Sequence, residues 1–393
     1  MSALARWGGR ARALPELGRI AASAAVERVR PVRSDDPAVA PTRVADLTPA
    51  WMTRALCPAG VRVVAVDLVD GSHGTTSRHR LRLRYDRDPA PLGLPETVFA
   101  KSSPGVLQRI TQAISGLVEA RFYLQLRERL DVAAPRCHHG AYDQRRMATV
   151  LLLEDLVATQ GATFLRPSDQ VDRADAEQVV RTLATVHATF ADRPPAGFKS
   201  YGRQWRDAFA LVDVESAFRR CLGECGELLD RSLRADPART WRAVLASIAA
   251  HEGRPPTLLH NDVHLGNWYR PAAGGIGLCD WQGVVLGDGA RDLAYALSTV
   301  LAVDDRRAWE DDLLALYGEE LHRRGGPAPD PPALRDRYRA QLWGALAFWA
   351  PTFSPPRLMP GDMQPRAVSG EMLRRIGSAC LDHDAFAAVG LRS

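Results

Sequence analysis

The stretch His260-Asn261-Asp262-Val263-His264-Leu265-Gly266-Asn267 decides the fold of this 393-residue chain. It begins at the end of a short β-prone run, and a second β-prone run ends at Asp280, eighteen residues after Asp262. Phosphoryl transfer from a nucleotide needs a carboxylate beside the acceptor hydroxyl and oxygen ligands that hold Mg²⁺ on the phosphates. Asp262, Asn267 and Asp280 are such groups, and their spacing allows them to converge on one centre. Each alone also fits loop capping or strand termination, but the joint spacing favours a phosphate site.

Residues before about 155 combine β-sheet patterns with helices. Leu81, Leu83 and Tyr85 alternate with arginines, a period of two that is typical of a half-exposed strand. A glycine-containing turn at residues 70–74 precedes this strand. We predict a short helix that begins at Thr48-Pro49, a small antiparallel sheet with strands at residues 61–69, 78–85, 98–101 and 147–153, and one long helix at residues 105–129.

The rest of the chain is predicted to be mainly helical. An antiparallel sheet followed by helices indicates the α+β class. His187 lies within an apolar helical pattern, and we interpret it as a core or bracing histidine rather than a catalyst. The predicted helical blocks are residues 173–191, 203–230, 236–251 and 288–350, and the β-prone runs between them are residues 257–260 and 276–280.

Charge and cysteine usage exclude several functions. The net charge is +5, and residues 1–34 account for all of it, with seven arginines against two glutamates. The body of the chain therefore lacks the basic surface of a nucleic-acid-binding protein, and we expect the N-terminal residues to be a partly disordered or loosely docked extension. No apolar run reaches the length of a membrane span. Six scattered cysteines without a secretion signal favour reduced thiols and a cytoplasmic location.

The motifs resemble those of the aminoglycoside phosphotransferase and choline kinase superfamily. The catalytic loop of that superfamily, His-x-Asp-(x)4-Asn, matches residues 260–267, and Asp280-Trp281 matches its metal-binding aspartate before an aromatic residue. Residues 287–294 match a Gly-(x)4-Asp-Leu-Ala segment, and residues 151–156 and 280–282 look most like the ecdysteroid-kinase-like branch. The resemblance implies a two-lobed protein-kinase-like fold. Its expected parts are an extension at residues 1–40, a nucleotide-binding lobe at residues 41–155 and a helical lobe at residues 156–393.

The resemblance also implies roles for single residues, with ATP and Mg²⁺ as cofactors. Asp262 would be the catalytic base, Asn267 and Asp280 would hold the metal, and His260 and Asp292 would brace the loop. In the nucleotide-binding lobe Lys101 would reach the phosphates. The other residues expected near the nucleotide are Glu119, which would pair with Lys101, the turn residues Ser72, Gly74 and Thr75, and the inter-lobe hinge Glu154 to Leu156.

Composition adds weight to Lys101. The chain contains 51 basic residues of the Lys and Arg types, yet only Lys101 and Lys199 are lysines. An arginine bias of this size makes a retained lysine informative, because a compact ammonium suits a phosphate contact that a planar guanidinium does not reproduce.

The acceptor is expected to be a small molecule that carries a hydroxyl group. An aromatic cluster, Trp343, Phe348, Trp349 and Phe353, suits a bulky or apolar alcohol better than a polycation. The acidic residues of the stretch 304–320 alternate with apolar ones and are interpreted as a solvated helix face. Two alternatives stay open, namely an antibiotic-inactivating phosphotransferase of the aminoglycoside type and a non-catalytic, nucleotide-binding pseudokinase module.

Overall fold

The chain forms two compact units in a computed structural model that describes residues 3–73, 76–356 and 364–391. Residues 1–40 and 156–163, which the sequence analysis placed outside the nucleotide-binding lobe, group with unit 1. Unit 1 comprises Met1–Glu128, Ala134–Thr163 and Pro271–Ala273, and unit 2 comprises Arg129–Ala133, Phe164–Arg270 and Gly274–Ser393.

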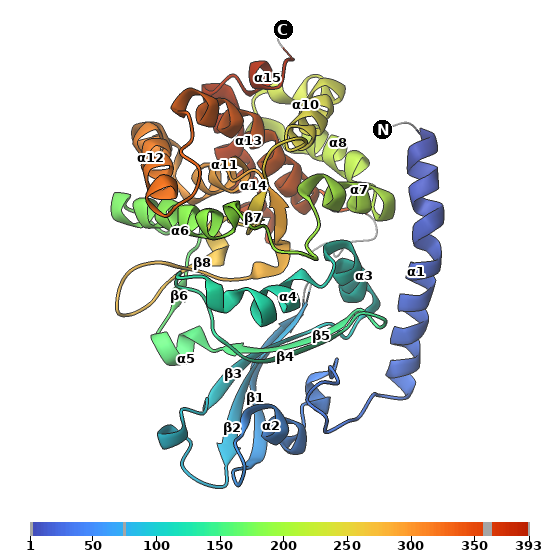
Figure 1. Ribbon diagram of the computed structural model, residues 1–393. Coiled ribbons are helices and arrows are strands. Elements are labelled where there is room, and N and C mark those ends of the chain that lie inside the picture. Colours follow the sequence, from blue (N-terminus) through green and yellow to red (C-terminus); the bar gives the residue numbers. More distant parts are fainter. Residues whose placement is uncertain (1–2, 74–75, 357–363, 392–393) are drawn as a thin grey trace. The chain divides into compact units, whose positions relative to one another are not determined.

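Unit 1 is built on a five-stranded antiparallel sheet with the strand order β1-β2-β3-β5-β4 (Figure 1). Four of these strands confirm the sequence prediction. The strand β4 was missed because its Cys-His-His-Gly start lacks an alternating apolar pattern. The strands are β1 (Val63–His73), β2 (Ser77–Tyr85), β3 (Thr97–Ser102), β4 (Cys137–Asp143) and β5 (Ala148–Glu154).

One face of this sheet carries the core of unit 1. Apolar side chains such as Leu81 and Leu152 pack there against Trp51 and Met52 of helix α2 (Pro49–Leu56). The helix begins as predicted, because the Thr48 hydroxyl accepts a hydrogen bond from the Trp51 N–H at 3.2 Å. Since strand side chains alternate between faces, the residues between those of the core point to the opposite face.

The prediction of one long helix at residues 105–129 is wrong. Helix α3 (Val106–Ser115) ends at Gly116 and Leu117, which have φ of +83° and +59°, and helix α4 (Val118–Gln125) starts anew. Glycine adopts this left-handed conformation freely, whereas leucine pays about 1–2 kcal/mol for it. Leu117 is held there because its side chain fills a buried apolar cluster with Ile20 and Met147. The break places Glu119 in the first turn of α4.

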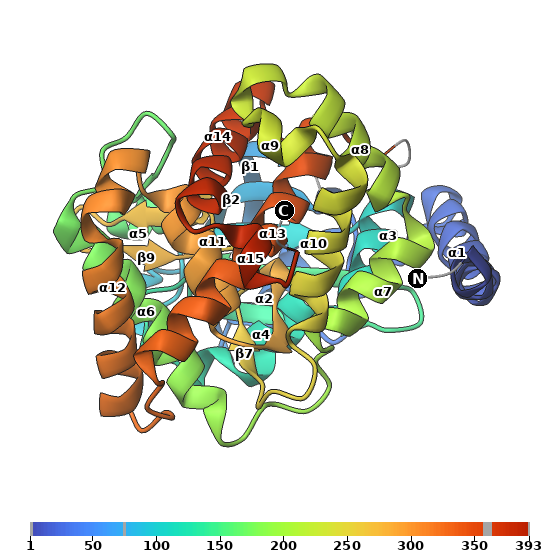
Figure 2. The same ribbon diagram turned by 90° about the horizontal axis from the view of Figure 1, so that it is seen from above.

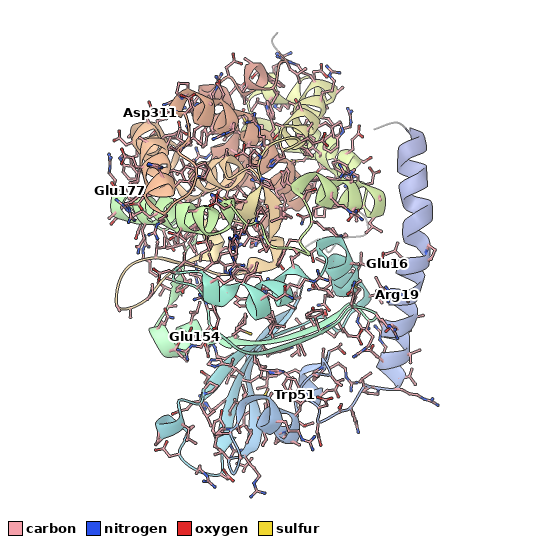
Figure 3. All side chains as sticks on the ribbon, in the orientation of Figure 1. Glu16, Arg19, Trp51, Glu154, Glu177 and Asp311 are labelled. Atoms are coloured by element: carbon pink, nitrogen blue, oxygen red, sulfur yellow. The ribbon has the colours of Figure 1, made fainter. Side chains whose placement is uncertain are left out.

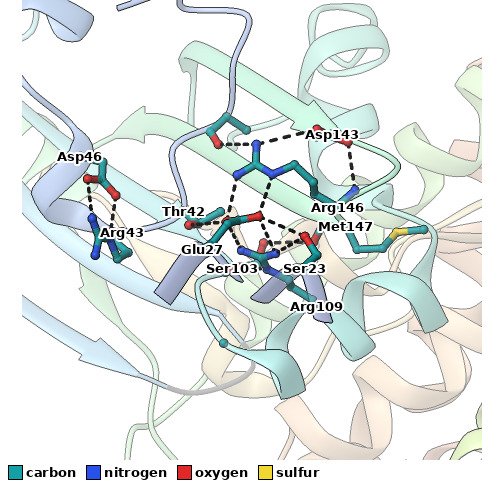
Figure 4. A network of polar contacts seen from close by, with 12 residues as sticks. Ser23, Glu27, Thr42, Arg43, Asp46, Ser103, Arg109, Asp143, Arg146 and Met147 are labelled. Carbon is teal, nitrogen blue, oxygen red and sulfur yellow. Dashed lines mark hydrogen bonds and ion pairs between the residues drawn. The ribbon is translucent and has the colours of Figure 1, made fainter. Parts of the chain in front are cut away.

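The expectation of a loose N-terminal extension is also wrong. Residues Ala3–Val29 form helix α1, which packs against α3 (Figure 1). Near its end, the buried Glu27 carboxylate accepts hydrogen bonds from Arg109 of α3 and from Arg146 beside β5, at 2.5 to 3.0 Å (Figure 4). Both arginines lie more than eighty residues from Glu27 in the sequence, so no local pattern signals this anchor.

Unit 2 is mainly helical, as predicted, and the α+β class is confirmed. Helix α13 lies among α8, α10, α11 and α14 and contacts all four (Figure 2). The predicted blocks are interrupted more often than expected, because 203–230 and 288–350 each divide into shorter helices. The helices, with the short α5 of unit 1, are α5 (Leu156–Gln160), α6 (Arg173–Ala191), α7 (Tyr201–Leu211), α8 (Val214–Glu224), α9 (Arg231–Arg234), α10 (Pro237–Ala249), α11 (Ala290–Val300), α12 (Val303–Arg323), α13 (Pro331–Phe353), α14 (Arg366–Asp382) and α15 (Ala385–Ala388).

Residues 260–267 lie between two short strands. Both predicted β-prone runs form strands, and residues 260–267 connect β7 to β8, while Asp280 follows β9. β7 pairs with β10, and β8 lies between β6 and β9. The strands are β6 (Thr163–Phe164), β7 (Thr257–Leu259), β8 (Trp268–Arg270), β9 (Gly277–Leu278) and β10 (Val285–Gly287). Within the described residues, no helix is long and apolar enough to cross a membrane.

Candidate active site

In unit 1, Lys101 of β3 and Glu119 of α4 form a buried ion pair. The Lys101 Nζ lies 2.5 Å from the Glu119 Oε1, and both side chains are about 95% buried. Strand register places Lys101 opposite Arg78 of β2 and Leu151 of β5, on the face of the sheet that turns away from the core cluster. Removing two charges from water costs several kcal/mol, so this pair depends on its close geometry. Glu119 thus lies where the resemblance expected it.

Strand β1 extends further along the chain than the sequence suggested. Gly71 and Ser72 belong to the strand and pair with His79 and Arg78. Gly71 is required there, because a Cβ at this position would lie 2.3 Å from the His79 Nδ1. Ser72 is exposed, whereas the predicted phosphate-contacting residues Gly74 and Thr75 lie outside the described residues.

The predicted hinge residues make local contacts within unit 1. The Glu154 carboxylate accepts hydrogen bonds from the side chains of Thr159 and Gln160 at 2.8 and 2.9 Å and from the Arg136 N–H at 3.1 Å. Burial raises the pKa of Glu154, but these bonds outweigh it and leave the pKa lowered. The Leu156 carbonyl accepts from the Ala162 N–H at 3.1 Å. A nucleotide base would therefore have to use other backbone groups of this segment.

In unit 2, Asp292 fixes the start of the loop formed by residues 260–267. Its carboxylate accepts hydrogen bonds from the backbone N–H groups of His260 and Asn261 at 2.7 and 2.8 Å, and the His187 Nε2 lies 3.3 Å away. Burial raises the pKa of Asp292, but His187, His260 and Arg291 outweigh it, so the pKa is lowered and the carboxylate stays charged. Asn261 has a φ of +65°, a costly conformation that these two bonds help to maintain.

His260 connects the loop to the end of β9. Its Nε2 lies 3.0 Å from the Cys279 carbonyl and its Nδ1 lies 3.3 Å from the Asp262 N–H. Because a carbonyl needs a donor and an N–H needs an acceptor, the ring is neutral with its proton on Nε2. Burial lowers the pKa of His260, which favours the same neutral form. His260 thus fixes Asp262 relative to the segment that carries Asp280.

Asp262 itself is contacted from three directions. The Tyr295 hydroxyl donates to its Oδ1 at 3.3 Å, and the His264 Nε2 lies 3.7 Å from the same oxygen. The Asn267 side-chain amide donates to the Asp262 backbone carbonyl at 2.7 Å. The side chain of Asp262 is 15% exposed, so its carboxylate is held but still accessible.

Asn267 and Asp280 offer oxygen atoms that fit Mg²⁺. The Asn267 amide nitrogen is engaged by Asp262, which leaves its Oδ1 as the group to bind a metal. The Cys279 N–H donates to the Asn267 carbonyl at 2.9 Å and so brings Asp280 close in the backbone. Within the described part of the chain no group of three His, Cys, Asp or Glu side chains suits a metal. Two oxygen donors nevertheless fit Mg²⁺, which takes its remaining ligands from phosphates and water.

Sequence reasoning missed two residues of α11 that contact the loop. The Arg291 Nη2 lies 3.5 Å from the Asn261 carbonyl, and its guanidinium lies 4.4 Å from the centre of the Tyr295 ring. Arg291 is fully buried. Residues four apart share a helix face, so Arg291 and Tyr295 were recognisable as neighbours, but only the docking of α11 shows that they meet the loop.

The predicted aromatic cluster divides between the site and the core. Trp349 lies 5.2 Å from the His264 ring and Phe348 lies 5.8 Å from the Tyr295 ring, measured between ring centres. Trp343 packs instead on Phe386, and Phe353 is buried elsewhere. Only Phe348 and Trp349 therefore lie among the residues that surround Asp262.

The chain is similar to known phosphotransferases. The profile of the phosphotransferase enzyme family matches residues 105–338, more than half of the chain. A solved spectinomycin phosphotransferase in complex with ADP and spectinomycin is 14% identical, with a TM-score of 0.46, over 83% of this chain and 95% of that chain. An ethanolamine kinase from Plasmodium vivax is 11% identical, with a TM-score of 0.45, over 80% of this chain and 81% of that chain. A choline kinase from Streptococcus pneumoniae is 13% identical, with a TM-score of 0.43, over 84% of this chain and 95% of that chain. No curated protein matches the chain.

Proposed function

The chain belongs to the phosphotransferase enzyme family, and we propose that it transfers the γ-phosphate of ATP to a hydroxyl group of a small molecule. The observation that carries this proposal is the arrangement around Asp262, whose carboxylate is fixed by neighbouring side chains and remains accessible. Within the superfamily, residues 151–156 and 280–282 favour the ecdysteroid-kinase-like branch.

The proposed step forms one bond and breaks one. The acceptor oxygen attacks the γ-phosphorus, the bond from that phosphorus to the bridging oxygen of ADP breaks, and the hydroxyl proton passes to the Asp262 carboxylate and then to water. Asp262 orients the hydroxyl before the attack. Lys101, held by Glu119, would bind the nucleotide phosphates. Bound Mg²⁺ would neutralise phosphate charge, with Asn267 and Asp280 as its protein ligands.

The surroundings of Asp262 support an acceptor that is a bulky or apolar alcohol. The Tyr295 hydroxyl contacts Asp262, Phe348 packs on the Tyr295 ring, and Trp349 packs on His264. Arg291, over the Tyr295 ring, is a buried cation. A polycationic acceptor would instead require carboxylates at this place.

Two acidic residues of α12 form ion pairs with arginines. Asp311 pairs with Arg335 and Asp312 pairs with Arg173 of α6. Figure 3 shows Asp311 on α12 and Glu177 on α6, and Glu177 also pairs with Arg173. Both aspartates are exposed and already paired with arginines, so they do not argue for an aminoglycoside acceptor.

Replacing Asp262 tests the proposed role directly. Asp262→Asn keeps the size and the backbone contacts but removes the base, so we expect turnover to fall by about 10²-fold or more, with the affinity for Mg–ADP unchanged. Asp311→Asn, which changes an exposed carboxylate of the same unit, serves as the control. Undiminished turnover in Asp262→Asn would exclude this residue as the base.

The acceptor class is tested by product mass. The purified chain is incubated with Mg–ATP and separate pools of steroid and other apolar alcohols, amino alcohols, and aminoglycosides, and products heavier by one phosphate are identified. We expect products from the apolar alcohols. Products from aminoglycosides alone would favour an antibiotic-inactivating enzyme, and tight Mg–ATP binding without any product would favour a pseudokinase.

A further inference from the structure

Helix α11 contacts three successive residues of the loop that carries the proposed base. Asp292 accepts from the N–H groups of His260 and Asn261, and Arg291 approaches the Asn261 carbonyl. Tyr295 lies one turn further along the helix and reaches the Asp262 carboxylate. The contacts of Asp292 and Arg291 fix the backbone of the loop, and only the contact of Tyr295 fixes the side chain of Asp262.

Tyr295 is placed to act as a rigid hydrogen-bond donor. Its ring is 1% exposed and lies against Phe348 and the Arg291 guanidinium. Burial and the nearby Asp262 charge raise the pKa of Tyr295 well above its ordinary value. The hydroxyl therefore stays protonated and donates a hydrogen bond to the carboxylate.

The two oxygens of Asp262 have different surroundings. Oδ1 receives the Tyr295 hydroxyl at 3.3 Å and has the His264 Nε2 at 3.7 Å. Within the described residues, the other oxygen, Oδ2, has no hydrogen-bond partner. A hydrogen bond to Oδ1 restricts rotation of the Asp262 carboxylate about its side-chain bond. The position of Oδ2 is therefore restricted as well.

We propose that Tyr295 is a positioning residue, which holds Oδ1 of Asp262 so that Oδ2 alone meets the acceptor hydroxyl. This inference rests on the proposed function, because it assumes that Asp262 accepts the acceptor proton. It assigns to Tyr295 no contact with the nucleotide. Its loss should therefore affect the chemical step and leave nucleotide binding unchanged.

Tyr295→Phe tests the inference because it removes only the hydroxyl. We expect kcat to fall by about tenfold, since modest misplacement of a reacting group costs one to two orders of magnitude. The KM for ATP and the Kd for Mg–ADP should stay within about twofold of wild type. A general loss of structure would change the KM, the Kd and the unfolding temperature together.

Tyr338→Phe is the matched control. Tyr338 is also a fully buried tyrosine of unit 2 whose hydroxyl donates to a carboxylate, in this case Glu310 at 2.6 Å. Its loss should lower the unfolding temperature without changing the kcat of the folded enzyme. If the two variants lose kcat equally, Tyr295 has only a structural role and the proposal is overturned.

A double-mutant cycle with Asp262→Asn separates this inference from the proposed function. If Tyr295 acts through Asp262, adding Tyr295→Phe to Asp262→Asn should not lower the residual turnover further. A further tenfold loss in the double variant would show that Tyr295 acts elsewhere. Wild-type turnover in Tyr295→Phe beside an inactive Asp262→Asn would refute the inference alone, whereas an active Asp262→Asn would refute the proposed function itself.

Discussion

Lys101 forms a close, buried ion pair that an arginine at the same position could not reproduce. Its ammonium lies 2.5 Å from Glu119 and is almost completely buried. A guanidinium is planar and larger, so it would displace Glu119 or lose the close contact that the ammonium makes with it. The identity of this residue, and not only its charge, should therefore matter for function.

Lys101→Arg is expected to raise the KM for ATP by about tenfold while the charge is kept. Lys199→Arg is the matched control, because Lys199 is the other lysine of the chain and pairs with Asp207 at 2.7 Å in a more exposed place. Steady-state kinetics with varied ATP measure both. Equal KM values for the two variants would show that Lys101 has no special relation to the nucleotide.

Sequence alone identified the residues with recognisable chemistry, but not those that hold them. Asp262, Asn267 and Asp280 were predicted from their spacing, and in the structure the Asn267 carbonyl accepts from the N–H of Cys279, the residue before Asp280. Tyr295 was not found, because its contact with Asp262 depends on how α11 docks on the loop. Such contacts join residues more than thirty positions apart, and no local pattern encodes them.

Helix α1 is part of the same unit as Lys101. Its Glu27 binds Arg109, and the Arg109 Nε donates to the Ser103 carbonyl, two residues after Lys101. Its Ile20 packs on Leu117, two residues before Glu119. One helix thus contacts the chain just after the lysine and just before its partner.

Glu27→Gln should destabilise unit 1 by roughly 3–5 kcal/mol, because it leaves the buried Arg109 and the partly buried Arg146 without their counter-charge. Thermal and urea unfolding measure the loss. Glu16→Gln is the control on the same helix, since Glu16 and Arg19, labelled in Figure 3, form an exposed pair at 3.7 Å. Comparable losses in both variants would contradict the anchoring role of Glu27.

The pH dependence of stability provides a second measure of the same anchor. Burial raises the pKa of Glu27, but the hydrogen bonds from Arg146 and Arg109 outweigh it and lower the pKa from 4.5 to about 2. The stabilisation is therefore complete above about pH 4.5 and is lost as the pH falls toward 2. In Glu27→Gln, this part of the acid-induced loss should be absent.

The errors of the sequence analysis concern elements whose partners are distant in sequence. Arginine-rich composition suggested a loose extension, but the anchor of α1 depends on Arg109 and Arg146. The break between α3 and α4 depends on Leu117, which a helical pattern includes without difficulty. In both cases tertiary burial outweighed the local signal, whereas α2 and β2 were predictable because their capping and alternation are local.

Ligand binding should increase the free energy of unfolding of the whole chain. A ligand that binds only the native state at a hundred times its Kd adds about 2.7 kcal/mol. We expect Mg–ADP to raise the unfolding temperature, and EDTA to reduce that rise. If Asp280 is a metal ligand as proposed, the effect of EDTA should vanish in Asp280→Asn, whose asparagine tolerates the φ of +61° at this position.

The control for this measurement is Asp311→Asn, which removes an exposed carboxylate that pairs with Arg335. It should keep the full Mg²⁺ dependence. If Asp280→Asn also keeps it, Asp280 does not bind the metal and another group must do so. Differential scanning fluorimetry with ADP, with and without Mg²⁺, distinguishes these results.

The contacts between α11 and the loop at residues 260–267 have a consequence for the exchange of segments between proteins. The loop, the strands that carry it and the helix that fixes it are continuous in the chain, from Thr257 to Val300. A graft of residues 260–267 alone would lose Asp292 and Tyr295 and leave Asn261 in a strained conformation without support. The smallest transplantable part is therefore the whole segment 257–300, which a single recombination event or one synthetic cassette can move intact into a related scaffold.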